Sequence, residues 1–346
     1  MQDIRVMQNT GVIFDWKRFR FDVRRDVRNC ALFLFFFYAV NIAVMLVIEA
    51  VALLNSPALR EMMSDPAHMM DMLSGSDQQG LVDAVTDAQS GAMLGLMSIC
   101  GIAAGGCVFL INRKKRFFTD LALPAAEPLT PRIFVILIFA TQGIQLVYGL
   151  IVDLIDRLLP EGLSLTEGYE AAMEGLSSPL GLAYIVLVGP LFEELIFRGA
   201  VMGPLRRFGD NFAILFSSIL FGFYHMVILQ IPFAFVLGLL LGYVAARWSL
   251  RASVALHVIV NGLSVLMSNL DSEAASTVGG FFMIGCGIVT LILLIRWREA
   301  FRARVRAGAV YYPHTWANGF SSIAFWVFLI VMTAAGFAQM YGFGMT

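Results

Sequence analysis

Nine long apolar segments constrain this chain more than any other feature. A helix that crosses the hydrocarbon of a bilayer needs about 20 mostly apolar residues, because the hydrocarbon is about 30 Å thick. Segments near or above that length are 30–54, 92–112, 133–153, 179–198, 211–229, 231–247, 252–270, 277–295 and 319–341. With 59% hydrophobic and 14% charged residues, the chain is too apolar for a soluble enzyme, a disordered chain or a nucleic-acid module. The sequence therefore predicts an all-α, polytopic integral membrane protein with about eight or nine transmembrane helices.

The basic residues gather on one side of the predicted membrane. With nine spans, 22 of the 24 Lys and Arg residues fall in the N-terminal arm and the even-numbered connections, and only Arg60 and Arg157 fall elsewhere. Lys and Arg accumulate on the cytoplasmic side of membrane proteins, so we expect the N-terminus inside and the C-terminus outside. We expect residues 1–29 to form a cytoplasmic basic arm, without a signal peptide, and residues 30–346 to form a single transmembrane domain.

The two long outer connections, 56–91 and 153–178, are acidic. The first is also rich in methionine and contains His68, so a metal trap is one interpretation. We favour a solvated, partly helical loop on the membrane surface. The sequence leaves open whether this loop recruits a substrate.

Ionisable groups inside the fourth apolar segment are functional candidates, because charges within a membrane span are costly. Glu194 and Arg198 are four residues apart, so they share a helix face and can form an ion pair. Glu193 points about 100° away from Glu194, which leaves its carboxylate free for a reacting group. Pro190 removes a backbone hydrogen bond just before this pair, so we expect the helix to kink or widen there.

Two histidines and an amide lie in neighbouring apolar segments. His257 and Asn261 are four residues apart on one predicted helix, and Glu193 and His225 each lie 16 residues from a turn at Gly209. An antiparallel hairpin would therefore bring Glu193 and His225 to similar depths. A glutamate near an imidazole can take a proton from water, and imidazole and amide groups can donate to an oxyanion. The residues alone leave open a hydrolytic site or a buried polar cluster that locks helices together.

Three short motifs occur in order on separate predicted helices. The segment Glu193-Glu194-Leu195-Ile196-Phe197-Arg198 fits EExxxR, the segment from Phe221 to His225 fits FxxxH, and the segment from His257 to Asn261 fits HxxxN. In these motifs the chain resembles the CPBP family of intramembrane glutamic proteases, which includes CAAX-processing prenyl proteases and bacteriocin self-immunity proteins. The resemblance covers about residues 179–270 and implies a protease core built from helices four to seven.

The resemblance also implies residue roles. Its four catalytic residues would be Glu193, His225, His257 and Asn261. The first would act as the base that activates water, the second would assist it, and the last two would form the oxyanion hole. The residues that support the site would be Glu194, Arg198 and Phe221. The resemblance implies neither a metal nor another cofactor.

The expected function is that of an intramembrane endopeptidase in a bacterial plasma (inner) membrane. Its partners would be the lipid bilayer and a membrane-associated or membrane-boundary protein substrate, with no nucleic acid. One alternative is a zinc-dependent intramembrane metalloprotease, although the HExxH motif is absent. Another is a non-catalytic scaffold, immunity protein or transporter, although the chain lacks the repeated halves typical of inverted-repeat transporters. The substrate, its lipidation and the oligomeric state stay open.

Overall fold

The computed structural model describes residues 15–57, 91–113, 128–160, 175–270, 272–308 and 314–342, with a few single residues between these ranges. Every regular element in these ranges is a helix. Within these ranges, six helices are long and apolar enough to cross a membrane. Three shorter apolar helices, Met93–Cys107, Asp210–Tyr224 and Ile323–Ala338, supply the remaining predicted spans. The prediction of an all-α polytopic membrane protein is confirmed.

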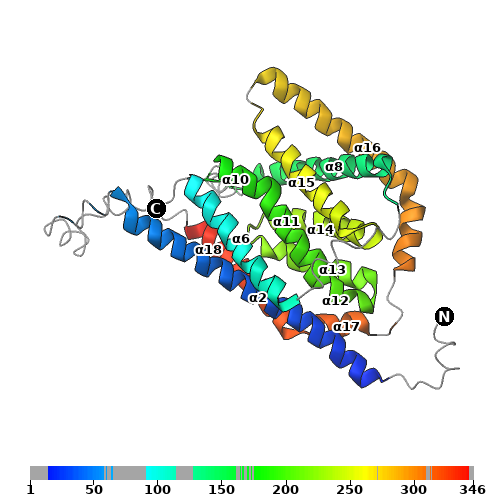
Figure 1. The fold of residues 1–346 in the computed structure, drawn as a ribbon. Helices are drawn as coiled ribbons and strands as arrows, with labels where there is room; N and C mark the ends of the chain where they lie inside the picture. Colours follow the sequence, from blue (N-terminus) through cyan, green and yellow to red (C-terminus); the bar gives the residue numbers. More distant parts are fainter. Residues whose placement is uncertain are drawn as a thin grey trace.

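Apart from the fourth span, which is described below, the helices form a peripheral group and a central group. The peripheral helices are α2 (Trp16–Asn55), α6 (Gly91–Arg113), α8 (Pro131–Asp156), α16 (Glu273–Ala307), α17 (Thr315–Phe320) and α18 (Ile323–Gly342). The central helices after the fourth span are α13 (Asp210–Tyr224), α14 (Gln230–Arg247) and α15 (Leu250–Ser268). Figure 1 shows α2 packed along α6 on one side and α16 along α8 on the other, with the central helices between them.

The fourth span, Pro179–Phe208, changes its helical type several times, and we call it helix four. Its successive segments are α10 (Pro179–Ala183), the π-helix η1 (Tyr184–Val188), α11 (Gly189–Glu194), the π-helix η2 (Leu195–Val201), α12 (Met202–Leu205) and the 3₁₀-helix η3 (Arg206–Phe208). Gly209 follows with a φ of 120°, which only glycine adopts without strain, and the chain then turns into α13. The predicted turn at Gly209 is confirmed.

The first helix begins earlier than the sequence predicted. Residues 1–29 were expected to form an arm before a span at 30–54, but α2 starts at Trp16. Asp15 caps this helix by accepting backbone N–H groups of the first turn. Val23 and Val27 are fully buried against the end of helix four, so the apolar stripe of the span continues into the arm. The described part of the arm is therefore a packed helix.

The fifth helix ends earlier than predicted, at Tyr224 instead of residue 229. His225 caps its C-terminus, and Met226 has a φ of 57°, a left-handed conformation that cannot continue a helix. His225 consequently lies at the C-terminal end of α13, where the chain leaves the helix.

Glycines allow close approach of α6 to its neighbours on two sides. A Cβ atom on Gly101 would come within 2.6 Å of the Asn41 side chain, and one on Gly105 within 2.4 Å of the Phe37 ring. Both partners belong to α2, and two glycines four residues apart on one helix face allow such close helix contact in a membrane. The other side of α6 packs against helix four.

The contact between α6 and helix four is equally tight. A Cβ atom on Gly95 would come within 2.4 Å of the backbone of Gly181, and one on Gly106 within 2.3 Å of the Phe192 ring. Phe192 directly precedes the two glutamates, so α6 supports the part of helix four that carries them.

Helix α16 illustrates how the periphery differs from the centre. Phe281 and Leu294 are 71% and 66% exposed, as expected for side chains that face lipid. Its buried residues are Gly279, Cys286 and Thr290, all small. Most of the acidic segment 56–91, including His68, lies outside the described residues.

Candidate active site

Helix four is widened on both sides of its two glutamates. Gly189 donates its backbone N–H to the carbonyl of Tyr184, five residues back, which is π-helical spacing. Pro190 follows as one of the first residues of α11, and a second π-helix begins directly after Glu194. The widening predicted at Pro190 is confirmed. It brings Glu193 and Glu194 onto a short α-helical turn between two irregular segments.

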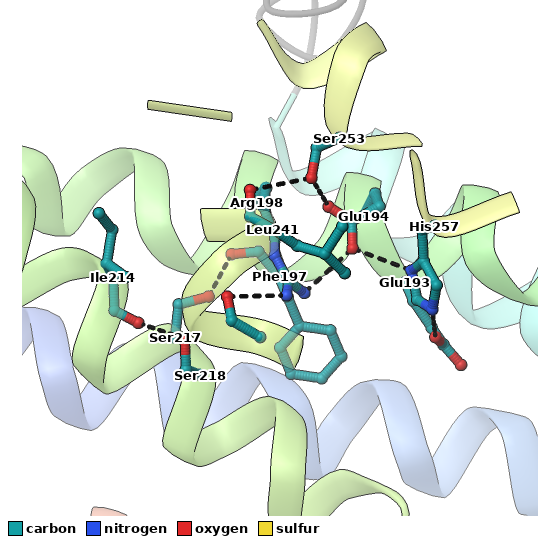
Figure 2. Close-up of polar contacts among 11 residues, drawn as sticks. Glu193, Glu194, Phe197, Arg198, Ile214, Ser217, Ser218, Leu241, Ser253 and His257 are labelled. Carbon is teal, nitrogen blue, oxygen red and sulfur yellow. Dashed lines mark hydrogen bonds and ion pairs between the residues drawn. The ribbon is translucent and has the colours of Figure 1, made fainter. Parts of the chain in front are cut away.

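Glu194 lies at the centre of a buried polar network (Figure 2). Its Oε1 forms an ion pair with Arg198 Nη1 at 3.2 Å, and the same oxygen lies 3.1 Å from His257 Nδ1. Ser253 donates its hydroxyl hydrogen to Oε2 at 2.5 Å. The Glu194 side chain is fully buried, so these contacts replace the water that a carboxylate would otherwise need. The predicted Glu194–Arg198 pair is present.

Arg198 connects helix four to two other helices. Its Nη2 donates to the carbonyl of Gly238 in α14 at 3.2 Å, and its guanidinium carbon lies 4.4 Å from the centre of the Phe221 ring. A guanidinium at that distance is attracted by the negative face of the ring. Arg198 therefore holds Glu194 while being held by α13 and α14.

Glu193 has much sparser surroundings than Glu194. Its Oε2 lies 3.8 Å from His257 Nε2, beyond ordinary hydrogen-bond length. Its side chain is 10% exposed, whereas that of Glu194 is 0% exposed. Glu193 is thus the less enclosed of the two carboxylates, as a base that binds water must be.

His257 stands between the two carboxylates, with one ring nitrogen toward each (Figure 2). Its imidazole is nearly fully buried and packs edge-on against the Phe221 ring, with 5.9 Å between ring centres. Because Glu194 accepts at Nδ1, the ring is held with Nε2 toward Glu193. The Glu194 carboxylate therefore fixes the orientation of the imidazole.

Phe221 is the shared neighbour of the three motifs. Its ring contacts Arg198 on one face, and its centre lies 4.9 Å from the His225 ring as well as 5.9 Å from the His257 ring. His225 also packs against Tyr224. The structure therefore brings His225 and His257 to the same aromatic ring.

Asn261 is held by helix four. Its Nδ2 donates to the backbone carbonyl of Ile185, within η1, at 2.9 Å. The side chain is half-buried and lies one turn beyond His257 on α15. One amide hydrogen is engaged by this bond, and the other remains for a further acceptor.

Ser253 is a contact within the candidate site that sequence reasoning missed. It lies four residues before His257, just as Asn261 lies four residues after it, so the three side chains form one stripe on α15. That spacing was the available signal, but a serine in an apolar helix commonly bonds only to its own backbone. In the structure its hydroxyl reaches across to Glu194.

A zinc site was the alternative reading of these side chains. Within the ranges that the structure describes, no three His, Cys, Asp or Glu side chains are grouped as metal ligands would be. The arrangement instead offers one accessible carboxylate, an imidazole fixed by a second carboxylate, and an anchored amide. Such a set can remove a proton from water and donate hydrogen bonds to an oxyanion.

Comparison with known proteins identifies relatives for this region. Residues 175–263 match the family model described as type II CAAX prenyl endopeptidase Rce1-like. The membrane-embedded CAAX protease MroQ of Staphylococcus aureus (strain USA300) is 26% identical over 195 residues, which cover 53% of this chain and 77% of that protein. No solved structure matches the chain. The matched family region contains all three motifs.

Proposed function

We propose, from the premise that this chain belongs to the CPBP family of CAAX proteases, that it hydrolyses a peptide bond with a water molecule activated by Glu193. The observation that carries this proposal is the contrast between the two glutamates on either side of His257. Glu194 is saturated with partners, whereas Glu193 is accessible and has its one ion contact within the described residues at 3.8 Å. A base must be free to bind water, so Glu193 suits that role.

The proposed reaction assigns a task to each group. Glu193 takes a proton from water, and the resulting hydroxide attacks the carbonyl carbon of the scissile bond. Asn261 donates a hydrogen bond to the oxygen that becomes negative, and His257 donates through Nε2, which requires a hydrogen on both of its ring nitrogens. His225 assists in holding the water. The proton held by Glu193 then passes to the departing amine nitrogen as the C–N bond breaks. Each proton is accounted for within the site.

The proposed substrate is an extended segment at the membrane boundary. A helix in lipid keeps its carbonyl groups hydrogen-bonded, so a peptide must unwind locally before hydroxide can attack it. The relative's name is that of a CAAX protease, so lipidated C-terminal peptides are one class of candidate and unmodified membrane-boundary segments are the other. In either case the bilayer and a membrane protein or peptide are the partners.

The direct test is mass spectrometry of candidate membrane peptides incubated with the purified protein. We expect a single new cleavage with the native protein and none with Glu193→Gln. The matched control is Glu299→Gln, which alters an exposed carboxylate on α16 whose neighbours are Arg298 and Arg302 and should leave cleavage unchanged. Cleavage by Glu193→Gln at the native rate would contradict the proposal.

A chelator separates the proposal from the zinc alternative. If Glu193 activates water by itself, cleavage continues after exhaustive treatment with a strong zinc chelator. A zinc enzyme would lose activity, because bound water reaches a pKa of about 7 only by coordination. Loss of cleavage with chelator, restored by one equivalent of zinc, would favour the metalloprotease.

The proposed orientation has the N-terminus in the cytoplasm of a bacterium and the chain in its inner membrane. The distribution of 22 of the 24 basic residues supports this orientation. In a variant without native cysteines, we expect an impermeant maleimide added to intact cells to label Leu158→Cys and not Ala300→Cys. Both positions are exposed. The reverse pattern would invert the topology.

A further inference from the structure

Helix four contains a backbone carbonyl that its own helix leaves without a donor. In the π-helical register of η1, the N–H of Gly189 bonds to the carbonyl of Tyr184. The next acceptor in that register is Ile185, and its donor would be the N–H of residue 190. Residue 190 is proline, which has no N–H. The α-helical donor for Ile185 would be Gly189, whose N–H is already directed to Tyr184.

The side chain of Asn261 supplies the missing donor. Its Nδ2 lies 2.9 Å from the carbonyl oxygen of Ile185, across the interface between α15 and helix four. In a membrane, a carbonyl freed by proline needs a partner from a neighbouring helix, because lipid offers none. Pro190 and the π-helical spacing leave the Ile185 carbonyl without a donor from its own helix. The Asn261 amide donates a hydrogen bond to this carbonyl.

We propose that Pro190 is a positioning residue that acts through Asn261, by leaving the Ile185 carbonyl free to anchor the amide. The contact fixes one N–H of Asn261 and thereby directs the rest of the amide. For catalysis the inference rests on the proposed function, in which Asn261 donates to the oxyanion. The contact itself does not depend on that function, and its energetic consequence is measurable without activity.

A double-mutant cycle, measured by thermal stability, tests the contact between Asn261 and the Ile185 carbonyl. Asn261→Leu keeps approximately the size of the side chain but removes its N–H, so in the native protein it leaves the Ile185 carbonyl without a donor. In Pro190→Ala, residue 190 regains an N–H that can bond to this carbonyl. We therefore expect Asn261→Leu to lower the Tm in detergent by roughly 2–4 °C more in the native background than in the Pro190→Ala background. Equal shifts in the two backgrounds would overturn the contact.

A second double-mutant cycle, measured by kcat, tests whether Pro190 acts through Asn261. We expect Pro190→Ala to lower kcat by roughly 10- to 10²-fold with little change in KM, because a misplacement of about 1 Å costs that much. In the Asn261→Leu background the same change should cause no further loss of kcat. A loss of equal size in both backgrounds would overturn the proposal, since Pro190 would then act on Glu193 through the shape of helix four.

A control and a second variant keep the outcome decisive. Pro179→Ala alters a proline at the start of the same helix, where the missing N–H has no helical acceptor, and should change neither kcat nor the cycle. If Pro190→Ala does not accumulate in the membrane, the Tm of Asn261→Leu alone tests the contact. An unchanged or higher Tm for that variant contradicts the contact, whereas a lower Tm supports it. If no peptide is cleaved, the proposed function fails while the stability cycle still reports on the contact.

Discussion

The two sides of the His257 ring differ in how completely their polar groups are satisfied. On the Nδ1 side, the Glu194 carboxylate has Arg198, Ser253 and the imidazole as partners, and its side chain is fully buried. On the Nε2 side, the Glu193 carboxylate lies 3.8 Å away and remains partly accessible. Two identical side chains, adjacent in sequence, therefore have opposite surroundings.

This difference suits Glu194 to a supporting role and Glu193 to the reacting role that we propose. A buried carboxylate with a full set of partners resists change, because moving it leaves a charge without compensation. A carboxylate with few partners is free to bind water and accept a proton. In the proposed function, Glu194 and its partners hold the His257 ring, and Glu193 is the reactive group. Substitutions on each side should consequently affect different measurable quantities.

The largest expected effect is on turnover, from Glu193→Gln. The amide cannot accept a proton from water, so kcat should fall by about 10²- to 10⁴-fold. The Tm should stay close to the native value, because no short hydrogen bond of this side chain is lost among the described residues. Single-turnover cleavage and thermal unfolding in detergent measure the two effects. A large drop in Tm with specific activity retained would reverse the roles assigned to the two sides.

The next effect is on stability, from Arg198→Ala. It leaves Glu194 buried without its cation, and breaking a buried ion pair typically costs about 3–5 kcal/mol. We expect reduced abundance in the membrane, quantified against total protein. Arg157→Ala is the matched control, since Arg157 and Asp153 are also four residues apart but both side chains are exposed. Similar loss of abundance in both variants would remove the distinction between buried and exposed pairs.

The smallest effect should come from Ser253→Ala, which removes one partner of Glu194 and leaves the ion pair. A hydrogen bond to a charged group contributes about 1.5–3 kcal/mol, so we expect a modest loss of stability together with reduced kcat. The control is Ser218→Ala, a buried serine whose hydroxyl bonds to its own helix at Ile214. If Ser253→Ala lowers stability and kcat no more than that control does, then Glu194 tolerates the loss of one partner. The proposed difference between the two sides of the His257 ring would then be contradicted at this contact.

Much of the architecture was predictable because lipid imposes a simple rule on sequence. A run of about 20 apolar residues must be a helix in the membrane, and each of the nine predicted spans corresponds to a helix. Helix ends were less predictable. Helix α2 starts at Trp16, and Val23 and Val27 in its first part are buried in the same core cluster as residues of helix four, which is a tertiary arrangement that residue composition does not report.

Most residues of the candidate site were predictable from the sequence, with Ser253 as the exception, but their contacts between helices were not. Spacing along one helix predicted the Glu194–Arg198 pair, because neighbours four residues apart meet on a single helix. The bonds of His257 to Glu194 and of Asn261 to Ile185 join different helices. Such contacts depend on helix rotation and depth, which the one-dimensional pattern does not determine.

In the proposed function, the glycines of α6 restrict the route by which a peptide would reach Glu193. At Gly95 and Gly106 even one added carbon would collide with helix four, and at Gly101 and Gly105 it would collide with α2. Seams too narrow for a single methyl group are closed to a polypeptide chain unless the helices separate. The interfaces of α6 with α2 and with helix four are therefore closed to an extended peptide. Such a peptide would have to enter from another side of the bundle.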